Sequence, residues 1–300
     1  MERIRKIDIH AHATPYQQYS PSMGRGVPMV SPEEVIGFYD EIDVEMGVLL
    51  PLTSPEYQNE QVTSSACKYI SDKYPDRFLW FCGVDPRAAG NRPDADLSML
   101  LNHYKALGAK GMGELTASLY PDDPMMDNLF AHCAACDMPV TIHIAPKLGG
   151  YYGIVDELGL PRLEKVLAKH PKLKIFGHSQ PFWAEMGADL TRDIRNGYPT
   201  GKITEEGVLP KLLRKHENLY CDLSAGSGSN ALMRDRAHAA RFVEEFSDRL
   251  LYGCDICMPD QIFPFKFDEF LTSMRESGEI SEKNYRKIVR ENAIRILGLD

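Results

Sequence analysis

The sequence predicts an α/β protein of one domain, residues 1–300, whose parallel strands close into a TIM-type (β/α)8 barrel. Short apolar runs rich in β-branched residues alternate with longer amphipathic stretches along the whole chain. Such alternation is typical of a parallel sheet covered by helices. There are eight apolar runs, which favours a closed barrel over an open sheet. No repeat, low-complexity tract or long linker divides the chain, so we expect a single domain.

The expected strands are apolar over nearly their whole length, as strands buried on both faces are. They cover residues 5–11, 48–52, 78–84, 109–115, 140–145, 173–178, 219–223 and 250–255. The expected helices between them cover residues 32–46, 61–74, 95–107, 126–136, 161–169 and 231–246. The first helix has a cap at Ser31, a proline at its first position and acidic residues directly afterwards.

Two stretches are less regular, residues 13–30 after the first strand and 180–207 after the sixth. We expect the second stretch to contain a helix of its own. Both leave the carboxyl ends of strands, where a barrel places the loops of its active site. They are therefore expected to border the functional site.

The charge balance and the cysteine content limit the classes of function. Lys and Arg number 34 and Asp and Glu 43, and the net charge of −9 argues against non-specific binding to nucleic acid. No segment approaches the roughly 18 apolar residues that span a bilayer, so we expect no membrane partner. The N-terminus carries no apolar run of signal-peptide length, and the seven cysteines are an odd number. We therefore expect reduced thiols and a cytoplasmic protein.

Two C-x-x-C pairs, Cys133/Cys136 and Cys254/Cys257, have the spacing of structural zinc sites. The first pair lies in a helical pattern and the second at the end of a strand. Zinc ribbons need knuckle turns rather than regular elements. We therefore interpret these cysteines as buried thiols.

Five polar residues stand at the carboxyl ends of expected strands: His10, His12, His143, His178 and Asp255. Side chains alternate along a strand, so His10 and His12 project to the same face. A single histidine of this kind is more often a buried structural residue, but five candidate ligands converging in a barrel indicate a metal site. Imidazole with carboxylate suits zinc, manganese, iron or nickel better than calcium or magnesium. The other histidines fall in helical or loop patterns and are expected to be structural: His103, His132, His170, His216 and His238.

This ordered set of strand-end residues resembles the amidohydrolase superfamily. It is most similar to the amidohydrolase-related branch, which contains aminocarboxymuconate-semialdehyde decarboxylase-like metal-dependent enzymes. The Val-Asp-Pro-Arg segment at 84–87 and the closing segment at 291–299 also resemble that branch. The resemblance therefore runs from about residue 4 to residue 299.

The resemblance implies that His10, His12, His143 and Asp255 bind a divalent transition metal. Zinc is the first choice, with manganese, iron and nickel as alternatives, and we expect about one or two ions per chain. Asp255 would exchange a proton with the attacking water and the leaving group. His178 would be a base beside a single ion or a ligand of a second ion, and it could polarise the substrate.

Glu114 departs from the common pattern, since it puts a carboxylate after the fourth strand, at the barrel mouth. It is a candidate catalytic residue, and several roles are open. It could bind or bridge metal ions, act as a general acid, or anchor a substrate amine. It could also orient a ligand histidine without touching an ion. In addition, residues 179–181 lack the glycine-rich continuation associated with the decarboxylases, which disfavours that reaction.

Candidate substrate contacts are residues expected near the mouth. Arg87 could clamp a carboxylate or form a structural ion pair. Trp183, Tyr151 and Tyr152 could form an aromatic wall, or pack locally as loop aromatics more often do. Cys257 has the same parity as Asp255 and could also face the site.

We expect a hydrolase that uses a metal-activated water on a C–N or C–O bond of a small organic acid, amide or lactone. The alternative enzyme is a metal-dependent non-oxidative decarboxylase or hydratase of an aromatic or unsaturated acid. A third hypothesis is a barrel without catalysis that serves as a binding or assembly module, which the five intact ligand positions disfavour. The expected partner is a small-molecule substrate, and homo-oligomerisation is left open.

Overall fold

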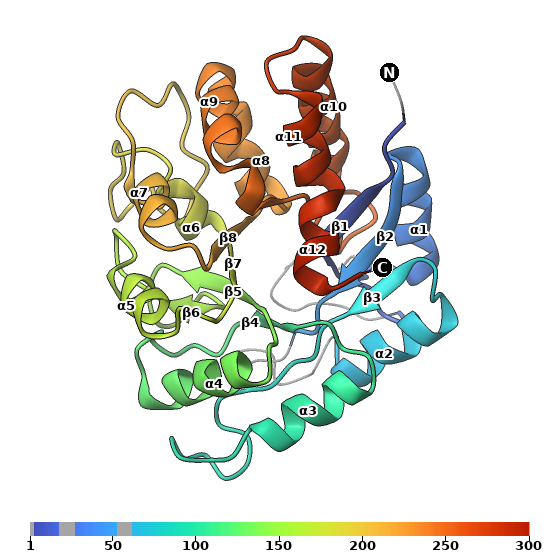
Figure 1. Cartoon of the computed structure of the whole chain (residues 1–300), viewed down its shortest axis with the longest axis vertical. Coiled ribbons are helices and arrows are strands. Elements are labelled where there is room, and N and C mark those ends of the chain that lie inside the picture. Colours follow the sequence, from blue (N-terminus) through green and yellow to red (C-terminus); the bar gives the residue numbers. More distant parts are fainter. Residues whose placement is uncertain (1–2, 18–27, 53–61, 300) are drawn as a thin grey trace.

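Parallel strands form the centre of the protein in the computed structural model, which describes residues 3–17, 28–52 and 62–299 (Figure 1). The strands of the barrel are β1 (Lys6–Ala11), β2 (Val44–Leu49), β3 (Phe78–Trp80), β4 (Met112–Leu115), β5 (Val140–Ala145), β7 (Ile175–His178), β8 (Leu219–Asp222) and β9 (Leu250–Leu251). A two-residue strand, β6 (Ile154–Val155), pairs only with β5.

Two seams join the hydrogen-bonded ladders β1-β2-β3 and β4-β5-β7-β8-β9 into one ring. At the first seam, just beyond β3, Cys82 forms a parallel bridge with Met112, and the N–H of Gly113 donates to the carbonyl of Cys82 at 2.9 Å. At the second seam, just beyond β9, the N–H of Asp255 donates to the carbonyl of His10 at 2.8 Å. The eight strands therefore close on themselves, and the predicted TIM barrel is confirmed.

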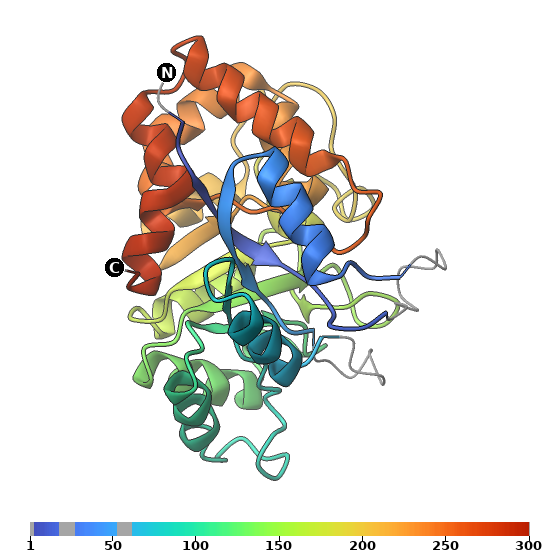
Figure 2. The same ribbon diagram turned by 90° about the vertical axis from the view of Figure 1, so that its right-hand side faces the viewer.

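Helices surround the strands, as the two perpendicular views show (Figures 1 and 2). They are α1 (Pro32–Glu41), α2 (Ser64–Lys73), α3 (Ser98–Ala106), α4 (Pro124–Ala135), α5 (Pro161–Lys169), α6 (Gln180–Ala184), α7 (Val208–Lys215), α8 (Ala225–Met233), α9 (Arg236–Phe246), α10 (Phe263–Glu276), α11 (Glu282–Arg286) and α12 (Asn292–Leu297), with a 3-10 turn at Ser247–Arg249 and a π turn at Lys287–Glu291. Among the residues described, no helix is both long and apolar enough to cross a membrane.

Side chains from opposite strands meet inside the barrel. One buried cluster joins residues in or directly after β1, β2, β3, β7, β8 and β9: Ile7, Ile9, Val48, Leu50, Phe81, Phe176, Tyr220 and Leu251. Strands spread around the ring can share one cluster only through the interior. A second, larger cluster fills the space between the strands and the helices, which bury their apolar faces there.

The structure differs from the sequence prediction at several element boundaries. The helix expected over 32–46 ends at Glu41, because Asp43 adopts a positive φ of 59° and the chain then enters β2. The helix expected over 231–246 is two helices, since Asp235 accepts the N–H of His238 and starts α9. The stretch 180–207 does contain a helix, α6, as predicted. Part of the stretch 13–30 lies outside the described residues.

Candidate metal centre

His10 and His12 lie side by side at the carboxyl end of β1, where the pairing with β2 is irregular between Asp8 and Ala11. Nδ1 of His10 donates to Oδ2 of Asp222 at 2.6 Å, and Nδ1 of His12 donates to the carbonyl of Leu50 at 2.9 Å. These bonds direct Nε2 of each ring toward the centre, where the two Nε2 atoms are in hydrogen-bond contact at 3.0 Å. Such an arrangement presents both Nε2 lone pairs to a single point.

Two carboxylates complete this set, which we name the first metal group: His10, His12, Asp255 and Oε2 of Glu114. The Glu114 oxygen lies 3.7 Å from Nε2 of His10 and 3.6 Å from Nε2 of His12. Oδ1 of Asp255 lies 3.7 and 3.5 Å from the same two atoms. Ligand atoms of a tetrahedral ion at about 2.0–2.2 Å are about 3.3–3.6 Å apart. The first metal group therefore fits one divalent ion with little rearrangement.

A second metal group consists of His143, His178 and the other oxygen of Glu114. Nδ1 of His143 is 2.5 Å from Oε1 of Glu114, and Nε2 of His178 is 3.9 Å from it. Nδ1 of His178 contacts the hydroxyl of Ser224 at 3.1 Å, which leaves Nε2 directed at the centre. Three overlapping sets have the spacing of metal ligands: His10, His12 and Glu114; His10, His178 and Asp255; and Glu114, His143 and His178. The carboxylate of Glu114 lies between the two groups, with one oxygen facing each.

The glycine before Glu114 explains how this carboxylate reaches the centre. Gly113 has a φ of 123°, a conformation that side chains disfavour. A Cβ at this position would lie 2.5 Å from the carbonyl oxygen of Thr141. Only glycine therefore lets β4 approach β5 this closely, and the approach brings Glu114 to His143.

The electrostatics of the metal-free centre also fit a cation. Burial lowers the pKa of His10, but the carboxylates of Asp222 and Asp255 outweigh it and raise the pKa to about 10. Burial raises the pKa of Asp255 to about 8. Burial and the charge of His10 lower the pKa of His12 to about 4. The metal-free centre therefore keeps a proton on His10, at the point where an ion would replace it.

Asp222 is a functional residue that the sequence prediction missed. It is fully buried at the end of β8, where it accepts from His10 and, through Oδ1, from the N–H of Ser224 at 3.0 Å. A carboxylate on the second ring nitrogen fixes the tautomer and orientation of a ligand histidine. The signal was available, because Asp222 is the next-to-last residue of the expected strand 219–223, close to its carboxyl end.

Trp183 does not line the mouth, contrary to the prediction of an aromatic wall. It is 2% exposed, packs against Phe182 and Phe242, and donates from Nε1 to the carbonyl of Asp222 at 2.9 Å. The hydrophobic residues after His178 form the short buried helix α6, which carries the indole inward. Trp183 is therefore packed locally, the alternative stated for loop aromatics, and its indole bonds the backbone of Asp222.

Arg87 forms the structural ion pair that was its alternative interpretation. Nη1 contacts both carboxylate oxygens of Asp85, at 3.0 and 2.9 Å, and Nη2 donates to the carbonyl of Ala117 at 2.7 Å. Tyr152, in contrast, does lie at the centre, since its ring centroid is 4.2 Å from that of His143. Cys257 is buried, 5% exposed.

The match to a known family agrees with this site. The chain matches the family described as amidohydrolase over residues 7–299. The chain belongs to the amidohydrolase family. It is accordingly a metal-dependent enzyme acting on a small molecule, and its cofactor is a divalent metal ion. A search of curated protein sequences finds no match.

Solved structures of decarboxylases and of a probable hydrolase share the fold. The 2,6-dihydroxybenzoate decarboxylase from Rhizobium is 17% identical, with a TM-score of 0.61 over 98% of this chain and 99% of that one. A probable 2-pyrone-4,6-dicarboxylic acid hydrolase from Acinetobacter baumannii is 14% identical, with a TM-score of 0.56 over 98% and 100%. The 5-carboxyvanillate decarboxylase from Novosphingobium aromaticivorans, complexed with manganese, is 17% identical, with a TM-score of 0.59 over 98% and 96%. At these identities the likeness establishes the barrel.

Proposed function

We propose that this amidohydrolase is a hydrolase with two divalent ions, which cleaves a C–N or C–O bond of a small organic acid, amide or lactone. The position of Glu114 carries the proposal. Its Oε2 faces His10 and His12, and its Oε1 faces His143 and His178. A carboxylate between two histidine pairs is suited to bridge two ions, and of the roles open for Glu114 we favour this one.

Each histidine of the centre has a partner that orients it. Asp222 and the carbonyl of Leu50 orient His10 and His12, and Ser224 contacts His178. His143 donates to Glu114 in the observed arrangement and is our candidate second-group ligand together with His178. The ions bound there would supply a water of lowered pKa and a polarised carbonyl.

Asp255 is our candidate for moving the proton. Its side chain is 20% exposed, whereas those of His10, His12, Glu114, His143 and His178 are 7% exposed or less. It is thus the member of the centre most open to substrate. Its carboxylate would accept the proton of the attacking water and deliver it to the leaving group.

Decarboxylation of an aromatic or unsaturated acid is the second candidate, because several of the structures with this fold are decarboxylases. It needs no added water, so the products separate the two reactions. Release of carbon dioxide from an aromatic acid, with no hydrolysis of amides or lactones, would replace the hydrolase proposal. Zinc as the resident metal, a cytoplasmic location and a homo-oligomeric state remain predictions.

Metal stoichiometry in Glu114→Gln tests the proposal, with Glu217→Gln on the surface as the matched control. Purified protein loaded with zinc is dialysed, and its metal content is measured by elemental analysis together with hydrolysis of lactone and amide panels. We expect about two ions per chain in the wild type and the control. The Glu114→Gln variant should hold about one ion and lose hydrolysis. Two ions in this variant would show that Glu114 only orients His143.

A further inference from the structure

Ser179, directly after the candidate ligand His178, has a backbone conformation that serine rarely adopts. Its φ is 106° and its ψ is 168°, a region that only glycine enters without strain. This conformation turns the chain from β7 into α6 within one residue, because α6 already begins at Gln180. The turn is tight, since a Cβ at Gly177 would lie 2.2 Å from the ring of Phe182. Glycine is therefore the residue expected at this turn.

The hydroxyl of Ser179 makes two hydrogen bonds that a glycine could not make. It donates to the carbonyl of Ile144 at 2.8 Å and accepts the N–H of the same residue at 3.2 Å. Both residues are buried, Ser179 at 1% and Ile144 at 0% exposure. Buried backbone groups need hydrogen-bond partners, and leaving them without any costs free energy. The bonds to Ile144 therefore offset the backbone strain of Ser179 and give a reason for serine at this turn.

These two bonds extend the pairing of β5 and β7 by one residue. The ladder between the two strands ends at the pair His143 and His178. Ile144 and Ser179 are the next residues along each strand, at the point where the main chain of β7 turns away into α6. The hydroxyl therefore takes the place of a backbone partner for Ile144, directly beyond the two histidines of the second metal group.

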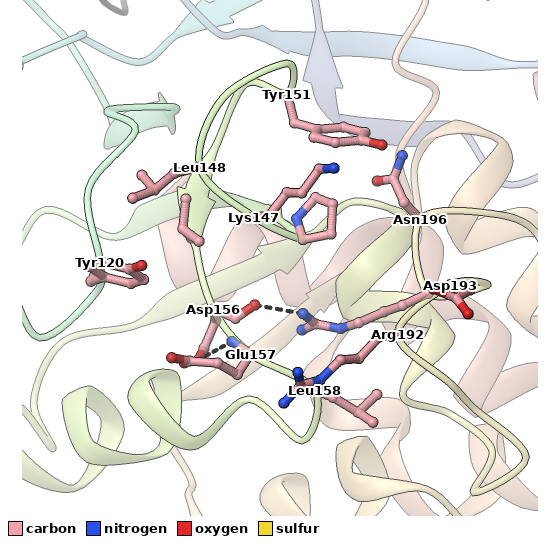
Figure 3. A pocket seen from close by; sticks show the side chains of 13 residues that line it. Tyr120, Lys147, Leu148, Tyr151, Asp156, Glu157, Leu158, Arg192, Asp193 and Asn196 are labelled. Atoms are coloured by element: carbon pink, nitrogen blue, oxygen red, sulfur yellow. Dashed lines mark hydrogen bonds between the residues drawn. The ribbon is translucent and has the colours of Figure 1, made fainter.

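The loop that follows β5 begins just beyond this contact. It faces a cavity of about 480 Å³, into whose lining it places Tyr151 (Figure 3). A loop beside a cavity is packed on fewer sides than a strand and moves more easily. The next residue of the loop, Tyr152, packs its ring against that of His143, with the centroids 4.2 Å apart. The bonds of Ser179 to Ile144 therefore fix the chain between this loop and His143.

We propose that Ser179 is a positioning residue of the second metal group, which sets the spacing of His143 and His178 for the second ion. Each histidine directly precedes one residue of the contact between Ser179 and Ile144, so a loosened contact lets the two rings move apart. Glu114 bonds Nδ1 of His143 and lies 3.9 Å from Nε2 of His178, and the same movement would change its place between them. The inference rests on the proposed hydrolase with two ions and deepens it.

Two substitutions separate the hydroxyl from the backbone strain. Ser179→Ala removes the hydroxyl and keeps the strained Cβ, whereas Ser179→Gly removes the hydroxyl and relieves the strain. We expect both variants to hold the second zinc ion about tenfold more weakly, with the affinity for the first ion unchanged. Competition with chelators of graded affinity measures the two zinc affinities. Ser179→Gly should also melt at a higher temperature than Ser179→Ala, which thermal unfolding of the metal-free proteins checks.

Ser118→Gly is the matched control, because Ser118 also has a positive φ, of 52°, but lies outside the ladder of β5 and β7. It should leave both zinc affinities unchanged. A second-ion affinity that recovers in Ser179→Gly together with thermal stability would show that Ser179 only stabilises the fold, and an equal loss of both ions would also overturn the inference. A wild type that binds one ion refutes the two-ion hydrolase and this inference with it. Two ions with unchanged affinities in both Ser179 variants refute only the role of Ser179.

Discussion

The two metal groups of the centre are held in different ways. In the first group, His10 and His12 each donate to a fixed acceptor outside the centre, the carboxylate of Asp222 and the carbonyl of Leu50. In the second group, His143 donates to Glu114 inside the centre, and Nδ1 of His178 lies 3.1 Å from the hydroxyl of Ser224 and 3.5 Å from Oδ2 of Asp222. Both histidines of the first group are therefore preorganised by close hydrogen bonds to the barrel, whereas His143 in the second depends on the shared carboxylate. The first group should bind an ion more tightly than the second.

Asp255 gives the largest expected effect, because it faces both groups. Asp255→Asn removes the carboxylate that would carry the proton, and general acid–base groups contribute about 10²–10⁴-fold. We expect hydrolysis to fall by that factor in steady-state assays with zinc-loaded enzyme. The first ion should remain, since His10, His12 and Glu114 are intact, and elemental analysis checks this. A loss of activity below tenfold would assign the proton transfer to another group, with His178 the next candidate.

Asp222→Asn acts mainly on the first group, because Oδ2 of Asp222 lies 2.6 Å from Nδ1 of His10 but 3.5 Å from Nδ1 of His178. An amide can turn its NH2 toward Nδ1 of His10 and so favour the wrong tautomer. We expect the affinity for the first ion to fall by about 10–100-fold, as measured by competition with a chelator. Asp76→Asn, at an exposed carboxylate, is the control and should leave the metal affinity unchanged. If Asp222→Asn weakens the second ion more than the first, the proposed difference between the groups is reversed.

The pH dependence of stability without bound metal tests whether His10 and Asp255 of the first group hold protons in the folded state. His10 has a pKa of about 10 in place of 6.5, and Asp255 one of about 8 in place of 3.8, so the folded state holds protons that the unfolded chain releases. Between pH 6.5 and 8 both shifts make stability fall as pH rises, by about 1.4 kcal/mol per pH unit and proton, and from 8 to 10 only the shift of His10 does. The low pKa values of His12 and His178, about 4 and 3, act only below this window.

A bound ion replaces these protons, so the zinc-loaded protein should keep its stability across the same pH range. Thermal unfolding with chelator and with zinc, at a series of pH values, compares the two forms. The apparent zinc affinity should also rise about tenfold per pH unit for each proton released. Equal pH profiles with and without zinc would show that the centre does not hold the ion at His10.

Much of the fold and the first group could be predicted because both depend on local patterns. The alternation of strands and helices predicts the barrel, and residues at strand ends must meet at its mouth. The second group was harder to predict from the sequence, because the position of Glu114 depends on the close approach of β4 to β5 that Gly113 allows. Trp183 was misplaced for a related reason. A loop aromatic gives no periodic signal, and only packing decides whether it turns inward.

The smallest expected effect separates support of the centre from contact with substrate. Trp183→Phe keeps a ring in the buried space but removes part of the indole, including the N–H that donates to the carbonyl of Asp222. We expect a loss of about 2 kcal/mol in the free energy of unfolding, with KM unchanged. Tyr152→Leu, beside His143, should do the opposite, raising KM while thermal stability stays nearly constant. A raised KM in Trp183→Phe would indicate that the indole contacts substrate. A side chain that only supports a backbone carbonyl should leave KM unchanged.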